Sequence, residues 1–155
     1  MRDKVHGVMS LGLIISGLCI AVAYISLHSI AAAALYLGII LISAVIILYA
    51  YCSKCPIRFT GCRHVFPGRV SGLLPPRTIK PYGALDYIGV AVPVTVLMAI
   101  PQYWLIRSAP ALILFWTLIM LGAVDIVLYV CPACGNEHCP MRGPRRKFMG
   151  KTRST

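Results

Sequence analysis

The stretch from Ile30 to Tyr51 reads IAAAALYLGIILISAVIILYAY and contains no formally charged residue. A membrane-spanning helix needs about 20 predominantly apolar residues, so this stretch is long enough to cross a bilayer. Three further stretches have the same character, at residues 8–27, 87–106 and 109–130. The sequence therefore predicts an all-α integral membrane protein with four transmembrane helices.

The overall composition agrees with a membrane location. Of the 155 residues, 59% are hydrophobic and only 12% are charged, whereas soluble domains are roughly 45–50% apolar. Four helices of about 20 residues leave about half the chain for loops and tails, which excludes a sizeable soluble catalytic domain. The sequence also lacks a Gly-rich phosphate loop, a carboxylate pair and a Ser/His/Asp set, so an independent enzyme is not expected.

The positive charge is distributed unevenly along the chain. There are 15 Lys and Arg residues against 4 Asp and Glu, for a net charge of +11. All the basic residues except Arg107 lie in the N-terminal tail, the loop between the second and third stretches, or the C-terminal tail. The positive-inside rule then places both termini and this loop in the cytoplasm, as in an inner (plasma) membrane protein. We expect contact with anionic lipid headgroups and no nucleic-acid partner.

The first apolar stretch has some features of a secretory signal. Arg2 and Lys4 precede it, and small residues follow near its end. Because the stretch is longer than the apolar region of a usual signal peptide, we expect it to be retained as a transmembrane helix. The lone Cys19 within it is expected to be a buried apolar residue.

The second and fourth stretches end alike, which indicates an internal repeat. Each is followed directly by a Cys-x-x-Cys motif. The predicted single membrane domain (1–155) divides into repeat one (8–66), a basic loop rich in Pro and Gly (67–86), repeat two (87–140) and a basic disordered tail (141–155). Because a helix hairpin returns the chain to its starting side, the repeats are parallel and both motifs are expected on the cytoplasmic face.

Each repeat contributes three cysteines and one histidine to a candidate metal site. The candidate ligands are Cys52, Cys55, Cys62, His64, Cys131, Cys134, His138 and Cys139. Two thiolates separated by two residues can bind one metal while backbone N–H groups donate to the sulfurs. Because the cytoplasm is reducing, metal ligation is preferred to stable disulfides. The residues suffice for two separate Cys₃His sites, or for one all-cysteine site that joins the repeats.

The sequence is compatible with two kinds of metal centre. Zn²⁺ would act as a structural clip, whereas an iron–sulfur cluster would carry electrons at the membrane surface. Prolines beside the cysteines, at Pro56, Pro132 and Pro140, favour iron because cluster-binding sequences contain such prolines.

Asp125 is an acidic residue within the fourth apolar stretch, where a charge is costly unless it is paired or functional. It is a candidate for a proton relay or a quinone contact. The alternative is a structural Asp held by Tyr87, Gln102 or Tyr129. Aromatic residues at 103–104 and 115–116 fit either an interfacial belt or a quinone pocket.

Three functions are compatible with these patterns. The first is a small membrane subunit that anchors, or relays electrons within, a redox complex with other subunits. The second is a quinone-linked thiol–disulfide oxidoreductase that uses the two Cys-x-x-Cys pairs. In outline this chain is similar to the bacterial disulfide-bond oxidase and the vitamin K epoxide reductases, with no residue motif in common. The third is a zinc-clipped scaffold or metal-handling protein without redox activity.

Overall fold

The structure is a computed structural model that describes residues 2–57, 59, 62, 65–75, 77, 82–132, 134–136 and 139. Every regular element within these residues is helical, and no strand occurs among them. Four of the helices in this part of the chain are long and apolar enough to cross a membrane. The prediction of an all-α, multi-pass membrane protein is therefore confirmed.

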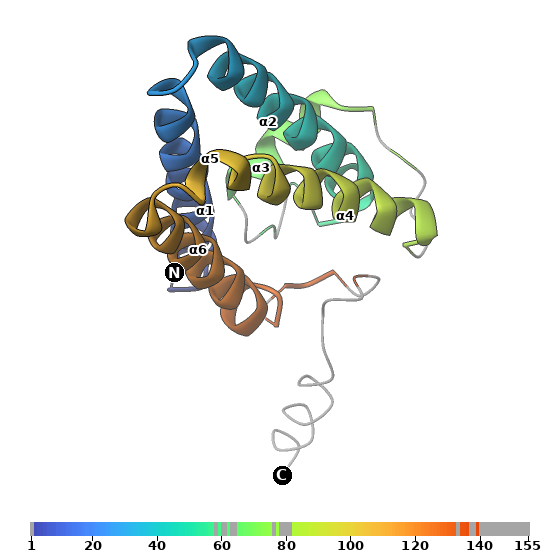
Figure 1. The fold of residues 1–155 in the computed structure, drawn as a ribbon. Helices are drawn as coiled ribbons and strands as arrows, with labels where there is room; N and C mark the ends of the chain where they lie inside the picture. Colours follow the sequence, from blue (N-terminus) through green and yellow to red (C-terminus); the bar gives the residue numbers. More distant parts are fainter. Residues whose placement is uncertain are drawn as a thin grey trace.

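The elements are α1 (Arg2–Ser26), α2 (Ile30–Ala50), the 3₁₀ turn η1 (Cys52–Lys54), α3 (Val65–Val70), the 3₁₀ turn η2 (Ser71–Leu73), α4 (Ala84–Ala99), α5 (Gln102–Leu105), α6 (Ala109–Asp125) and the π-helical segment η3 (Ile126–Val130). The turns that join α1 to α2 and α5 to α6 lie on one side of the bundle (Figure 1). The start of α1, the end of α2, the start of α4 and the end of η3 lie toward the other side.

The helices pack as two crossing pairs. The main contacts are α1 against α6 and α2 against α4, so each pair takes one helix from each half of the chain. Tyr36, Leu105 and Phe115 are almost wholly buried where the helices meet. Many apolar side chains on the outer faces of the helices, such as Leu41 and Ile113, remain exposed, as expected of lipid-facing positions.

Cys19 lies on the lipid-facing side of α1. The structure leaves it exposed, so the expectation that it is buried was wrong. The reason is that α1 packs through a different face, where Ser10, Ala21 and Ile25 are completely buried. An apolar sequence gives little signal as to which face of a helix meets protein and which meets lipid.

Pro101 interrupts the third span, and a tyrosine on another helix compensates for the break. Proline has no backbone N–H, so the carbonyl of Leu97, four residues earlier, loses its helical partner. The Tyr36 hydroxyl donates to this carbonyl at 2.8 Å. Gln102 donates its side-chain amide to the next carbonyl, that of Met98, at 2.7 Å. Proline predicts a kink at both Pro93 and Pro101. The span breaks at Pro101, whereas Pro93 lies within an uninterrupted α4.

Glycines allow close approach of the helices in both crossing pairs. A Cβ added at Gly89 in α4 would lie 2.9 Å from the Cβ of Ala50 in α2. A Cβ at Gly122 in α6 would lie 2.8 Å from Ile14 Cγ1 and 3.0 Å from the Ser10 carbonyl oxygen in α1. Small residues at these positions permit the backbone contact that stabilises helix pairs in lipid.

We predict that Gly89→Ala destabilises the protein, because the helices must separate to accommodate the new methyl group. The expected loss is about 1–3 kcal/mol, the usual cost of overpacking. The controls are Gly12→Ala and Gly38→Ala, where an added Cβ meets nothing within 4 Å. These should gain up to about 1 kcal/mol from helix propensity. Unfolding in detergent, followed by tryptophan fluorescence, measures the difference. Equal stability of Gly89→Ala and Gly38→Ala would contradict the close crossing.

Candidate functional site

Both Cys-x-x-Cys motifs form turns at the ends of transmembrane helices. The Cys55 backbone N–H donates to the Cys52 carbonyl at 3.1 Å, and the Cys134 N–H donates to the Cys131 carbonyl at 3.2 Å. The preceding segments differ, because the first motif begins in the 3₁₀ turn η1 and the second follows the π-helical η3. The same local turn therefore closes both motifs despite different helix endings.

The cysteines of the two halves lie close enough to influence one another electrostatically. Burial raises the pKa of the Cys55 thiol. A backbone hydrogen bond from Ile57 lowers it, and the thiols of Cys134, Cys62 and Cys139 raise it. Burial, with Cys139 and Cys134, raises the pKa of Cys131 to about 11. Thiols that raise each other's pKa do so because each added negative charge opposes the next. Cysteines from both halves of the chain therefore lie on the same side of the bundle, within range of one another's charge.

The candidate metal ligands that the structure describes do not form a closed coordination shell. Across the described ranges, no three His, Cys, Asp or Glu residues are grouped closely enough to hold a metal ion. Two of the eight predicted ligands, His64 and His138, lie outside the described residues. The six cysteines are all described and all partly buried. Metal ligation by the eight-residue set therefore stays a prediction.

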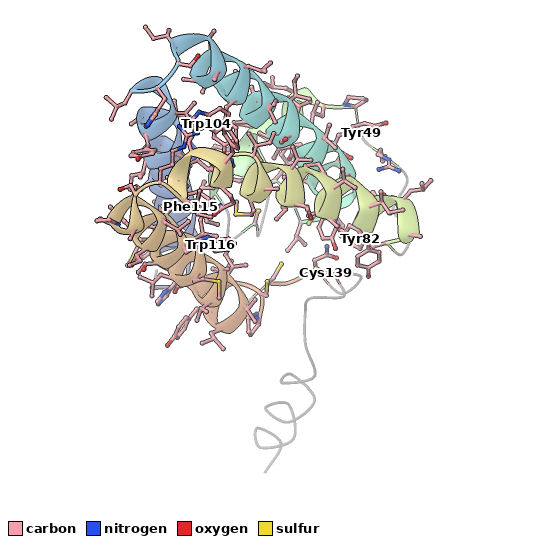
Figure 2. All side chains as sticks on the ribbon, in the orientation of Figure 1. Tyr49, Tyr82, Trp104, Phe115, Trp116 and Cys139 are labelled. Atoms are coloured by element: carbon pink, nitrogen blue, oxygen red, sulfur yellow. The ribbon has the colours of Figure 1, made fainter. Side chains whose placement is uncertain are left out.

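Asn136 connects the second half of the chain to the first cysteine motif. Its side chain is only 2% exposed. The amide nitrogen lies 3.6 Å from Cys55 Sγ and 3.1 Å from the Tyr82 hydroxyl oxygen. The Tyr82 hydroxyl donates in turn to the Tyr51 carbonyl at 3.2 Å, and Figure 2 labels Tyr82 beside Cys139. A single buried amide thus reaches both the first motif and the start of α4.

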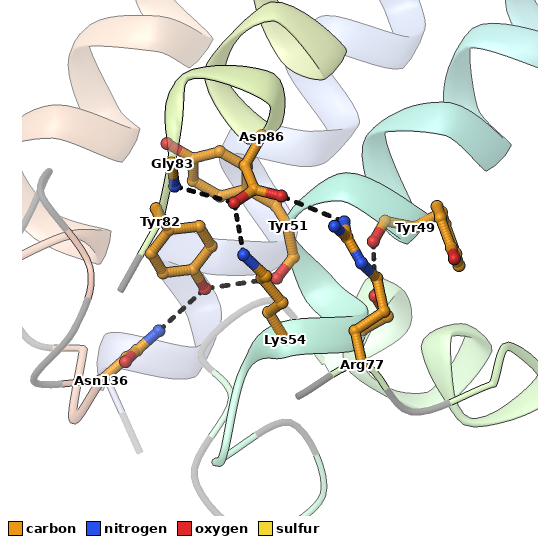
Figure 3. A network of polar contacts seen from close by, with 9 residues as sticks. Tyr49, Tyr51, Lys54, Arg77, Tyr82, Gly83, Asp86 and Asn136 are labelled. Carbon is orange, nitrogen blue, oxygen red and sulfur yellow. Dashed lines mark hydrogen bonds and ion pairs between the residues drawn. The ribbon is translucent and has the colours of Figure 1, made fainter. Parts of the chain in front are cut away.

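Asp86 holds the first cysteine motif against α4 (Figure 3). Its carboxylate accepts from Lys54 Nζ at 2.5 Å, from Arg77 Nη1 at 3.0 Å and from the Gly83 backbone N–H at 2.9 Å. The carboxyl side chain is 3% exposed and that of Lys54 is 11% exposed. Lys54 lies between Cys52 and Cys55, so this buried ion pair fixes the position of the motif itself.

Asp86 was not predicted, because the third helix was expected to begin near Tyr87. The structure begins α4 at Ala84, which places Asp86 in its first turn. An acidic residue there can accept from the N–H groups at the helix start, as Asp86 does from Gly83. The basic residues Lys54 and Arg77, expected at the lipid headgroups, both bond to this carboxylate.

Asp125 pairs with a residue that the sequence analysis did not connect to it. The Nδ1 atom of His6 lies 2.8 Å from Asp125 Oδ1, and the His6 ring stacks on Tyr129 with centroids 4.6 Å apart. The second carboxylate oxygen, Oδ2, is buried and has no hydrogen-bond partner within the described part of the chain. Two of the residues expected to hold Asp125 have other partners. Tyr129 stacks on His6, and the Gln102 side chain bonds to Met98 and Trp116.

The aromatic residues near the opposite side range from buried to exposed. Phe115 is completely buried in the core, and the Trp116 indole N–H donates to the Gln102 side-chain oxygen at 3.2 Å. The guanidinium of Arg107 lies 5.3 Å from the centre of the Tyr103 ring. Figure 2 labels Trp104, Phe115 and Trp116 along this region. Tyr103 is 65% exposed and Trp116 is 39% exposed, so both the interfacial belt and the quinone pocket stay predictions.

Comparison with known proteins gives no relative: no family model, no curated protein and no solved structure matches this chain.

Proposed function

We propose that the protein is a small multi-pass membrane subunit with one metal centre bound by cysteine thiolates. The surface that binds it, here called the cysteine face, is formed by the loop cysteines of both halves of the chain, so the metal joins the two halves. The observation that carries the proposal is the contact between the two motifs: Asn136, which lies between Cys134 and Cys139, reaches Cys55 Sγ at 3.6 Å. The ligand pool is Cys52, Cys55, Cys62, His64, Cys131, Cys134, His138 and Cys139. Thiolates in this number and spacing suit Zn²⁺ or an iron–sulfur cluster.

The surroundings of Cys55 and Cys131 weigh against these two thiols as the attacking groups in thiol–disulfide exchange. Exchange requires at least one exposed thiol with a lowered pKa. Cys55 and Cys131 are half-buried, and their pKa values are raised. A bound cation relieves the repulsion among neighbouring thiolates, because it supplies the positive charge that the cluster lacks. Quinone-linked exchange by the two Cys-x-x-Cys pairs is the alternative.

The charge asymmetry supports a place for this centre at the cytoplasmic surface of the inner (plasma) membrane, with both termini on the same side. The remaining basic residues then contact anionic lipid headgroups. With iron, the centre would relay electrons within a membrane redox complex formed with other subunits. With zinc, it would clip the helix ends of a scaffold or a metal-handling protein.

The pair of His6 and Asp125 supports a proton-accepting contact for a lipid-soluble quinone. One carboxylate oxygen is buried without a donor in the described chain, so it can accept from a hydroxyl group. The His6 side chain is 35% exposed, and Tyr129 beside it is 54% exposed. This contact is relevant only if the cysteine face carries electrons.

The deciding experiment is analysis of iron, zinc and acid-labile sulfide in protein purified anaerobically in detergent. We expect a stoichiometric metal content. Iron with sulfide would establish an electron carrier, and zinc alone would establish the structural clip. Metal-free protein with six alkylatable loop cysteines would overturn the proposal in favour of thiol exchange. Labelling of Cys55 from outside spheroplasts would overturn the cytoplasmic orientation.

A further inference from the structure

Asn136 lies in the sequence between Cys134 and Cys139, but its side chain contacts the first half of the chain. Its amide nitrogen is 3.6 Å from Cys55 Sγ, a usual separation for a hydrogen bond to sulfur. The amide is 2% exposed, so water competes little for this contact. The adjacent Gly135 also borders the first half, because a Cβ there would lie 3.4 Å from Ile57 Cδ1.

The surroundings of Asn136 fix the direction of its amide. The Tyr82 hydroxyl oxygen, 3.1 Å away, accepts from the same nitrogen and donates onward to the Tyr51 carbonyl. The Tyr82 ring also stacks on Tyr51, with centroids 4.6 Å apart. The two N–H bonds of the amide are therefore directed at one oxygen and one sulfur. A neutral donor aimed at a thiol sulfur stabilises the thiolate form more than the thiol form.

We infer that Asn136 is a positioning residue that donates a hydrogen bond to the Cys55 thiolate when Cys55 binds metal. Groups that bond to metal ligands orient them and tune their electron donation, and losing one commonly costs 10–100-fold in metal affinity. This inference rests on the proposed metal-binding function. In this arrangement Asn136, in the second half of the chain, donates to Cys55, a metal ligand in the first half.

The test uses Co²⁺ binding to the full-length protein in detergent under anaerobic conditions, with the sulfur-to-cobalt charge-transfer band as readout. Asn136→Leu keeps a similar volume but removes the donor. We expect its Co²⁺ affinity to fall about 10–100-fold. We also expect the band to move to lower energy, because an unbonded thiolate gives up electron density more readily. If Asn136 only stabilised the fold, the Asn136→Leu protein that still binds Co²⁺ would show the charge-transfer band at the wild-type energy.

Three further variants complete the design. Asn136→Gln retains a donor and should recover part of the affinity. Tyr82→Phe removes only the oxygen that orients the amide, so it should shift the band less than Asn136→Leu does. If Asn136→Leu does not fold, Asn136→Ala provides a smaller, uncharged variant without the donor. If the wild type binds Co²⁺ and the donor-free variant shows the same band and the same affinity, the role of Asn136 is overturned while the metal centre stands. No Co²⁺ binding by the wild type, together with no iron or acid-labile sulfide in the anaerobically purified protein, would overturn the metal centre and the inference together.

Discussion

Replacing Cys131 with serine is expected to release the metal from the whole protein, including metal held by Cys52 and Cys55. A hydroxyl is a poor ligand for the metals that thiolates bind. Structural zinc contributes about 10–16 kcal/mol through four ligands, so one lost thiolate should cost roughly 100-fold or more in affinity. The measurement is the metal retained per protein after dialysis against a competing chelator.

The matched control is Cys19→Ser, because Cys19 lies on the lipid-facing side of α1, outside the loop cysteines. It should retain the full wild-type content. Retention of half the metal by Cys131→Ser would show two independent sites, one in each repeat. That result would contradict a centre that joins the two halves.

Asp86→Asn is expected to destabilise the protein by about 3–5 kcal/mol, the usual cost of breaking a buried ion pair. The amide can still accept from Gly83, but it no longer neutralises Lys54 and Arg77. The Lys54 side chain is only 11% exposed, so its charge would be left largely without water. Thermal or denaturant unfolding in detergent measures the effect.

Two comparisons isolate the charge as the cause. Arg107→Gln removes a cation that lies against the Tyr103 ring, and it should change stability by less than about 1 kcal/mol. Asp86→Leu combined with Lys54→Met removes both charges of the closest pair and should recover part of the loss. An Asp86→Asn protein as stable as the wild type would mean that Lys54 and Arg77 are already solvated.

The four spans could be predicted because apolar length alone determines which segments cross a bilayer. The break at Pro101 followed from the missing N–H of proline, but its compensation by Tyr36 could not be predicted from local sequence. The pairing of α1 with α6 and of α2 with α4 depends on contacts between distant segments. Lipid-facing and protein-facing positions look equally apolar, which is why Cys19 was misplaced.

For the candidate site, residue type and spacing identified the cysteines but not the residues that position them. Asn136 bonds to Cys55 across 81 positions, and His6 bonds to Asp125 across 119 positions. A single sequence carries no signal for such long-range contacts. Asp86 was different, because an acidic residue three positions after Gly83 is a local mark of a helix start. Its omission came from placing that start near Tyr87.

Two of the ion pairs, His6–Asp125 and Lys54–Asp86, have a consequence for how the chain assembles during synthesis. His6 and Lys54, the basic partners, belong to the first hairpin, whereas Asp125 and Asp86 belong to the second. The first hairpin therefore enters the membrane before its acidic partners exist, and it completes its pairing only after the second arrives. Two first hairpins from neighbouring chains offer each other no carboxylate at these positions. The charge arrangement thus favours closure within one chain over mispairing between nascent chains.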